Sequence, residues 1–320
     1  MVTRFVKKLI KPLVPESVRA GIRRHSAQRS LQHRASQFGI TVRYKRDFIE
    51  VRRGRSILRI GRKHEVYLMD MIEFFDFFFG AVQAEGAVAD FSRPRRHRLV
   101  GFDEFPVLFP SIPEPYVTTK QYLEFASLKA GDVVLDLGAY AGVASVAFAR
   151  KVGPTGAVFA FEPDTGNFRA ATENINTARR FGYPPVTLIN KAVWCDNDGL
   201  DFSCEGASGS SAVSIVGSGR GSVVRVPSTT LSEFFKENHI SRVDFIKIDV
   251  EGAEVEVLDS SRELLSRTRP KIVIDTHIVA GIPTTERCCQ ILKEIGGYET
   301  RIVDQPGGTL PLIEASPRLT

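Results

Sequence analysis

The chain has 320 residues, of which 43% are hydrophobic and 25% charged, and its formal net charge at pH 7 is +6. This length can bury a full core in one large domain or in one domain with an appendage, and the composition excludes a globally disordered chain. The four cysteines contain no C-x-x-C pair, and no apolar run approaches the roughly 18 residues of a membrane-spanning helix.

A basic segment forms the beginning of the chain, where cations crowd residues 1–36. Such a segment attracts an anionic membrane surface, an acidic glycan or nucleic acid, while a solvated helical face explains the same charges equally well. Lys11 and Pro12 interrupt its apolar part before a signal-peptide core of the usual length. We therefore expect a cytoplasmic protein, whose basic segment either docks on the main domain or contacts the inner membrane surface peripherally.

Residues 1–115 predict an N-terminal α+β extension. Apolar and polar residues alternate on either side of Arg53-Gly54, which predicts a hairpin. Residues 67–82 carry an apolar stripe at helical spacing and predict one helix that packs on the core. Residues 84–115 are rich in Pro, Arg and aromatic residues without a sustained period, and we expect them to form part of a substrate-binding wall.

Residues 116–320 predict a single domain in which strands and helices alternate. Alternation of this kind is typical of an α/β fold with a doubly wound, mostly parallel sheet. A Gly- and Ser-rich stretch, 206–222, interrupts it and is interpreted as a mobile surface loop or hairpin. The predicted strands cover residues 133–137, 157–161, 186–193, 243–249 and 271–276, and the predicted helices cover 118–128, the stretches after Asp164 and from Ala253, and 285–295.

The first predicted strand of this domain runs into a Gly-x-x-x-Gly turn formed by Gly138 and Gly142. A turn of this type brings backbone N–H groups and a helix N-terminus to a nucleotide-like ligand, and the missing Cβ atoms let such a ligand lie against the main chain. Tyr140 occupies the position of the middle glycine in the dinucleotide-binding fingerprint. This departure argues against a nicotinamide-dependent dehydrogenase.

Acidic residues follow two further strands of the predicted sheet. Glu162 comes directly after strand 157–161, roughly twenty residues beyond the glycine turn, where an acid is placed to bind ribose hydroxyls. The alternative for Glu162 is an acid at the N-terminus of the following helix, favoured by the helix dipole. Asp249 ends the strand 243–249, so three strand ends point to one site at the same edge of the sheet.

Three segments together resemble the FkbM-type family of S-adenosylmethionine-dependent methyltransferases. They are Asp136-x-Gly138-Ala139-x-x-Gly142, Phe161-Glu162-Pro163 and Asp244-x-Ile246-Lys247-Ile248-Asp249-Val250-Glu251-Gly252-x-Glu254. The resemblance covers residues 114–302 and implies a Rossmann-like class I methyltransferase with a seven-stranded sheet. It also implies S-adenosylmethionine as the cofactor, bound by Asp136, Gly138, Ala139, Tyr140, Gly142 and Glu162.

The resemblance implies transfer of the methyl group to a hydroxyl of a sugar, glycan or small natural product. Attack of a hydroxyl on a sulfonium methyl needs in-line positioning and a base that takes the hydroxyl proton. The catalytic candidates are Lys247, Asp249, Glu251 and His277, and a histidine at the edge of the sheet is suited to act as the base near neutral pH. A structural ion pair between Lys247 and Asp249 and a dipole role for Glu251 remain alternatives.

A metal role for these residues is the weaker alternative. Asp249, Glu251, Asp275 and His277 together offer ligands for a divalent ion, but they form no compact ligand motif, and we expect no metal at the site. The sequence also departs from the family, which commonly has Asn at the position of Tyr140, Glu shortly before the histidine and Gly in place of Ser260. The second departure leaves the assignment of the base open.

Two other functions fit parts of the pattern. A catalytically inactive binding protein would keep the nucleotide-like pocket without turnover. A nucleic-acid methyltransferase would use the basic N-terminus, but base-amino methylation commonly requires an Asn/Asp-Pro-Pro-aromatic motif, whereas this chain has Asp249-Val250-Glu251-Gly252. We therefore expect a hydroxylated small molecule or glycan as the partner and no specific nucleic acid.

Overall fold

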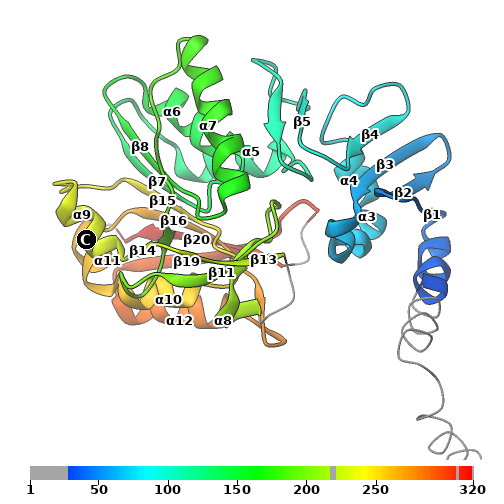
Figure 1. Ribbon diagram of the computed structural model, residues 1–320. Helices are drawn as coiled ribbons and strands as arrows, with labels where there is room; N and C mark the ends of the chain where they lie inside the picture. The colour runs from blue at the N-terminus through cyan, green and yellow to red at the C-terminus, as the bar shows by residue number, and fades with distance from the viewer. Residues whose placement is uncertain (1–27, 217–220, 308–309, 319–320) are drawn as a thin grey trace, which may run out of the picture.

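The computed structural model describes residues 28–216, 221–307 and 310–318 (Figure 1). The predicted basic segment lies mostly outside these ranges, and its residues 28–36 belong to a helix that ends at residue 37. None of the helices in the described ranges has both the length and the apolar composition needed to cross a membrane.

A seven-stranded sheet forms the centre of the molecule, in the order β19-β20-β16-β15-β7-β8-β9. Strands β7, β8, β9, β15 and β16 are parallel, and β20 pairs antiparallel with both β16 and β19. This arrangement confirms the doubly wound, mostly parallel α/β sheet. The strands are β7 (Val133–Leu137), β8 (Ala157–Phe161), β9 (Thr187–Ile189), β15 (Phe245–Ile248), β16 (Lys271–Asp275), β19 (Tyr298–Val303) and β20 (Leu312–Pro317).

Helices cover both faces of this sheet (Figure 1). Because side chains alternate along a strand, Val134 packs in the cluster formed with one helical layer, and Leu135 packs in the cluster on the opposite face. Both residues are fully buried, as expected for strands covered on both faces. One layer contains α5 (Tyr116–Ala126), α6 (Val143–Val152) and α7 (Thr165–Arg180), and the other contains α9 (Leu231–Glu237), α10 (Glu254–Ser260), α11 (Arg262–Thr268) and α12 (Thr285–Ile295).

Short elements complete the edges of this domain. The predicted strand over 186–193 is divided into β9 and β10, and β10 pairs with β14 outside the main sheet. The remaining elements are β10 (Ala192–Val193), β11 (Leu200–Cys204), β12 (Ser211–Ala212), α8 (Val213–Val216), β13 (Ser222–Val226), β14 (Ser228–Thr229), β17 (Ile278–Val279) and β18 (Ile282–Pro283).

The N-terminal extension contains its own small sheet. The predicted hairpin at Arg53-Gly54 is confirmed, since β2 and β3 pair antiparallel around it. Asn174 of α7 donates to Leu108 O at 2.8 Å and accepts from Leu108 N at 2.8 Å, which ties the extension to the sheet domain. The small sheet contains β1 (Thr41–Tyr44), β2 (Phe48–Arg53), β3 (Ser56–Gly61) and β4 (Val88–Phe91), and β5 (Arg95–His97) and β6 (Val107–Phe109) form a separate antiparallel pair.

The single helix predicted over residues 67–82 is wrong. The segment forms η1 (Arg62–Tyr67), α3 (Leu68–Glu73) and α4 (Phe75–Phe79), with a break at Phe74, where φ is −110° and ψ is 36°. One continuous helix would place Phe74 and Phe75 close together on its surface. The break instead buries Phe75 in the core, while Phe74 lines the cavity described below.

A buried histidine in the extension makes stability depend on pH. His97 is 8% exposed and packs against the rings of Phe91 and Phe109. Burial, helped by the charge of Arg95 and opposed by that of Asp90, lowers the pKa of His97 to about 4. Below the unfolded pKa of about 6.5, the unfolded chain therefore gains a proton that the folded chain does not, and stability falls as pH falls.

We expect this group to lower the free energy of unfolding by about 2 kcal/mol between pH 7.5 and pH 5. Urea unfolding at both pH values measures the loss. In the His97→Gln variant, which cannot ionise there, the pH-dependent loss should be smaller by that amount. Equal losses in the two proteins would show that His97 does not keep its neutral form in the fold.

Candidate active site

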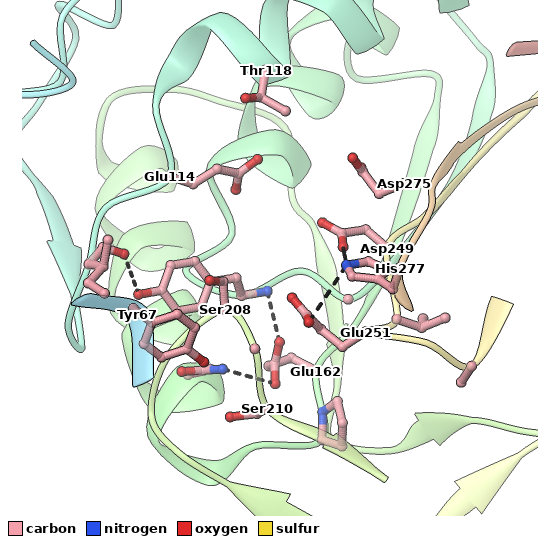
Figure 2. A pocket seen from close by; sticks show the side chains of 18 of the residues that line it. Tyr67, Glu114, Thr118, Glu162, Ser208, Ser210, Asp249, Glu251, Asp275 and His277 are labelled. Carbon is pink, nitrogen blue, oxygen red and sulfur yellow. Dashed lines mark hydrogen bonds and ion pairs between the residues drawn. The ribbon is translucent and has the colours of Figure 1, made fainter. Parts of the chain in front are cut away.

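A cavity of about 430 Å³ lies at the carboxyl ends of β7, β8, β15 and β16 (Figure 2). The residues that follow these strands line it, namely Gly138, Glu162, Asp249 and His277. Ligands of open α/β sheets bind in the crevice at this edge, and the volume lies within the roughly 300–1,000 Å³ of small-molecule sites. The predicted meeting of the strand ends at one site is therefore confirmed.

The glycines of the turn are required by packing within the protein. A Cβ on Gly138 would lie 1.8 Å from the carbonyl oxygen of Asp249, and a Cβ on Gly142 would lie 3.3 Å from the Cβ of Ala171. Protein atoms thus occupy the space that we expected a ligand to use. Gly138 and Tyr140 line the cavity, whereas Asp136, Ala139 and Gly142, also predicted to bind the cofactor, are not among the lining residues.

Gly138→Ala is expected to destabilise the protein by about 3 kcal/mol or more, because the new methyl group overlaps a backbone oxygen in a region of positive φ. Thermal or urea unfolding measures the change. Gly182→Ala is the matched control, since Gly182 has the same φ of +83° as Gly138 but no atom lies within 4 Å of its Cβ position. A loss no larger than that of the control, about 1–2 kcal/mol, would contradict the close packing at Gly138.

The carboxylate of Glu162 is held by three donors in the wall of the cavity. Its Oε2 accepts from Tyr140 N at 2.8 Å, and its Oε1 accepts from Asp164 N at 2.8 Å and from the side-chain amide of Asn167 at 3.4 Å. Burial, together with the charge of Asp164, raises the pKa of Glu162 to about 8. A carboxylate has about four lone-pair sites, so Oε2 keeps capacity for a further donor from a ligand.

Tyr140 occupies the position of the middle glycine of the dinucleotide-binding fingerprint, and its contacts hold it in the conformation that this turn requires. It adopts φ 49°, a left-handed conformation that is uncommon for a non-glycine residue. Its backbone N–H donates to Glu162, and its hydroxyl donates to Ile112 O at 2.8 Å. Two hydrogen bonds therefore fix the residue and join the turn to the segment that leads into α5.

Lys247 lies behind the wall and holds Asp249. Its ammonium lies 2.6 Å from Gly138 O, 3.3 Å from Asp136 Oδ1 and 3.2 Å from Asp249 Oδ2, which confirms the predicted pairing with Asp249. Burial opposes the charge, but Asp249 and Asp136 outweigh it and raise the pKa of Lys247, so the group stays protonated. Lys247 is 2% exposed and is not a lining residue, so its predicted catalytic role is corrected to a positioning role.

His277 is surrounded by carboxylates. Its Nδ1 lies 2.9 Å from Glu254 Oε1, and its Nε2 lies 3.8 Å from Asp249 Oδ1 and 3.6 Å from Glu251 Oε2. Burial opposes a charge here, but Glu251, Glu254 and Asp249 raise the pKa of His277 well above its ordinary value. A protonated ring cannot accept a proton, so these carboxylates disfavour His277 as the base near neutral pH.

Several polar residues of the cavity were not in the predicted site, among them Glu114, Tyr122 and Gln305. Glu114, between Pro113 and Pro115, lines it, and burial raises its pKa to about 7 although Lys247 lowers it. The hydroxyl of Tyr122 on α5 donates to Asp275, and Gln305 donates to Asp275 Oδ1 at 2.7 Å. The charge beside two prolines was the only sequence signal for Glu114, and none marked Tyr122 or Gln305.

The Gly- and Ser-rich stretch, for which we predicted a mobile surface loop or hairpin, connects the antiparallel strands β11 and β13 and forms part of the cavity wall. Ser208, Gly209 and Ser210 line the cavity. Ser210 donates to Asp164 Oδ2 at 2.8 Å, and Asn167 donates to Ala207 O at 3.0 Å. These contacts join the stretch to the N-terminus of α7, because the side chain of Asp164 also caps that helix.

The extension supplies an aromatic wall. Tyr67 donates to Glu205 Oε2 at 2.8 Å, and His64 Nε2 lies 3.0 Å from Glu205 O, so the two parts of the chain are joined beside the cavity. The expectation that residues 84–115 contribute to the wall is confirmed for 112–115. The extension residues that line the cavity are Val66, Tyr67, Asp70, Met71, Phe74, Phe77 and Phe78.

Several known proteins are similar to this chain. Hexuronic acid methyltransferase AglP of Haloferax volcanii is 27% identical over 150 residues, which cover 46% of this chain and 56% of that protein. The chain therefore matches about half the length of this relative. A crystal structure of the FkbM methyltransferase from Methylobacillus flagellatus KT has a TM-score of 0.41 at 17% identity, over 61% of this chain and 50% of that chain.

An O-methyltransferase from Bacillus cereus in complex with SAH has a TM-score of 0.41 at 15% identity, over 64% of this chain and 82% of that chain. The methyltransferase FkbM domain matches residues 136–296, which are half of the 320 residues. The matched range begins at Asp136 and contains the strand-end residues Glu162, Asp249 and His277. The chain therefore belongs to the FkbM methyltransferase family.

Proposed function

We propose that this methyltransferase transfers a methyl group from S-adenosylmethionine to a hydroxyl oxygen of a sugar, a glycan or a small natural product. The observation that carries the proposal is the convergence of Asp249, Glu251 and His277 on the cavity that Glu162 also lines. The similarity to a hexuronic acid methyltransferase favours a saccharide as the acceptor.

The residues present fit S-adenosylmethionine, which is the cofactor that membership of the family implies. Six carboxyl groups line the cavity and favour a cation such as a sulfonium, and they belong to Asp70, Glu114, Glu162, Asp249, Glu251 and Asp275. Glu162 keeps an acceptor site for the ribose hydroxyls, as an acid after the second strand does in related nucleotide sites. When bound, the cofactor supplies an electrophilic methyl group.

The chain must then position the acceptor and take its proton. The acceptor oxygen forms a new bond to the methyl carbon, the hydroxyl proton passes to a base, and the electron pair of the broken C–S bond stays on sulfur. Figure 2 shows Glu114 on the opposite side of the cavity from Asp249 and His277. We assign proton acceptance to Glu114, because it lines the cavity and because burial raises its pKa to about 7, which suits a general base near neutral pH.

An acceptor screen tests the proposal. Purified protein is incubated with methyl-¹³C-labelled S-adenosylmethionine and with uronic acids, neutral sugars, glycans, phenols and short nucleic acids. We expect S-adenosylhomocysteine to form with a hydroxylated acceptor, and the product's ¹³C chemical shift to identify an O-methyl group. Methylation of nitrogen or carbon, or transfer to nucleic acid alone, would overturn the assignment.

A further inference from the structure

Three side chains from two loops form a compact set of potential metal ligands. Asp249 and Glu251 lie between β15 and α10, and His277 follows β16. One ligand atom of each residue lies within 4.8 Å of the other two. Octahedral coordination at about 2.1 Å places neighbouring ligand atoms about 3.0 Å apart, and His277 Nε2 lies 3.6 Å from Glu251 and 3.8 Å from Asp249, so shifts of less than about 1 Å bring these atoms to that spacing.

The histidine of this set is oriented from behind. Glu254, which is fully buried, faces Nδ1 of His277 at 2.9 Å. Gly252 N and the hydroxyl of Thr284 donate to Glu254 at 2.9 and 3.0 Å, so this carboxylate is itself fixed. A carboxylate behind the ring is the arrangement that directs Nε2 of metal-binding histidines toward the ion.

The aspartate of the set is oriented in the same way. Lys247 pairs with Asp249 Oδ2 at 3.2 Å, and Oδ1 is the oxygen that faces Nε2 of His277. Lys247 cannot turn away, since its ammonium also donates to Gly138 O at 2.6 Å. Two of the three ligand atoms are therefore held toward one point by residues outside the set.

We propose that Asp249, Glu251 and His277 bind a divalent cation, which holds an oxygen of the methyl acceptor. Two carboxylate oxygens and one imidazole nitrogen suit ions that accept mixed oxygen and nitrogen ligands, such as Mn²⁺. With three protein ligands, the ion keeps open positions for the acceptor. This inference rests on the proposed function and replaces our expectation, from the sequence, that the site holds no metal.

The cation would also select the acceptor. Two adjacent oxygens, as in a vicinal diol or in a hydroxyl beside a carboxylate, fill two open positions at once, whereas an isolated hydroxyl fills only one. Coordination lowers the pKa of the bound hydroxyl, and its proton passes to Glu114 across the cavity. The cation itself is neither oxidised nor reduced.

Titration of Mn²⁺ into metal-free protein tests the site without cofactor or acceptor. Electron paramagnetic resonance measures the free Mn²⁺, and calorimetry measures the affinity. We expect one Mn²⁺ to bind per chain, with a dissociation constant at least tenfold higher in Glu251→Gln and in His277→Ala. Glu263→Gln is the matched control, because Glu263 is an exposed acid on α11 outside the cavity. Thermal unfolding verifies that each variant is folded.

The outcomes separate this proposal from the proposed function. The cation site is rejected, even if methyl transfer continues, when no Mn²⁺ binds up to millimolar concentration. It is also rejected when wild type, Glu251→Gln and Glu263→Gln bind Mn²⁺ with equal affinity. Site-specific Mn²⁺ binding without transfer to any acceptor would keep the cation site and reject the proposed function. If His277→Ala does not fold, Glu254→Gln replaces it, with an expected tenfold to hundredfold loss of affinity.

Discussion

Replacement of Glu162 by alanine is expected to weaken S-adenosylmethionine binding about ten- to hundredfold, because a ribose hydroxyl loses a charged acceptor, a bond that contributes about 1.5–3 kcal/mol. Calorimetric titration of both proteins measures the ratio. Since the pKa of Glu162 is about 8 and its charged form accepts hydrogen bonds, binding to wild type should release a proton below pH 8 and strengthen as pH rises to that value.

Two controls separate this effect from loss of the fold. Glu162 also accepts from Tyr140 N and Asp164 N, and its removal leaves buried donors unpaired, so thermal unfolding must accompany the titration. Glu162→Gln keeps one accepting oxygen and should lose less affinity than Glu162→Ala. Equal affinity in wild type and Glu162→Ala would remove Glu162 from the cofactor site.

Glu114→Gln is expected to lower kcat by a factor of about 10²–10⁴, the usual contribution of a positioned general base. The wild-type rate should rise as pH increases through about 7, where Glu114 loses its proton, and this inflection should be absent in the variant. Steady-state kinetics between pH 5.5 and 9, with the acceptor found in the screen, measures both effects.

A second acid in the same cavity provides the comparison. Asp275 is held by Tyr122 and Gln305, and burial together with the charge of Asp249 raises its pKa to about 8. If Asp275 rather than Glu114 takes the proton, the inflection stays in Glu114→Gln and disappears in Asp275→Asn. That result would reassign the base without affecting the cofactor site.

Several predicted site residues that do line the cavity come at the carboxyl ends of strands. Gly138, Glu162 and Asp249 each lie in a short motif directly after a strand. Because parallel strands place their carboxyl ends at one edge of the sheet, the sequence alone predicted that these three residues line one cavity. His277 reached the same cavity for the same reason. The fold was predictable for a related reason, since the strands of a buried parallel sheet are continuous apolar runs.

The residues that were missed reach the cavity only through tertiary packing. Glu114 precedes α5, Ser210 lies in a stretch of low complexity, and Gln305 comes between β19 and β20, so no local pattern connects them with the strand ends. The break at Phe74 was missed for the same reason. The sequence shows one stripe of aromatic residues, but it does not show that some of them pack in the core and others line the cavity. The space beside Gly138 was misassigned because Asp249 O, which fills it, lies far away in the sequence.

The most direct test of the account is calorimetric titration of folded wild-type protein with S-adenosylmethionine, with NADH titrated in parallel. The account predicts that one S-adenosylmethionine binds per chain, that S-adenosylhomocysteine competes with it and that NADH does not bind. The assignment of the cavity as the S-adenosylmethionine site would be contradicted if no S-adenosylmethionine bound, whether Mn²⁺ and a uronic acid were present or not. Selective binding of NADH would contradict it as well.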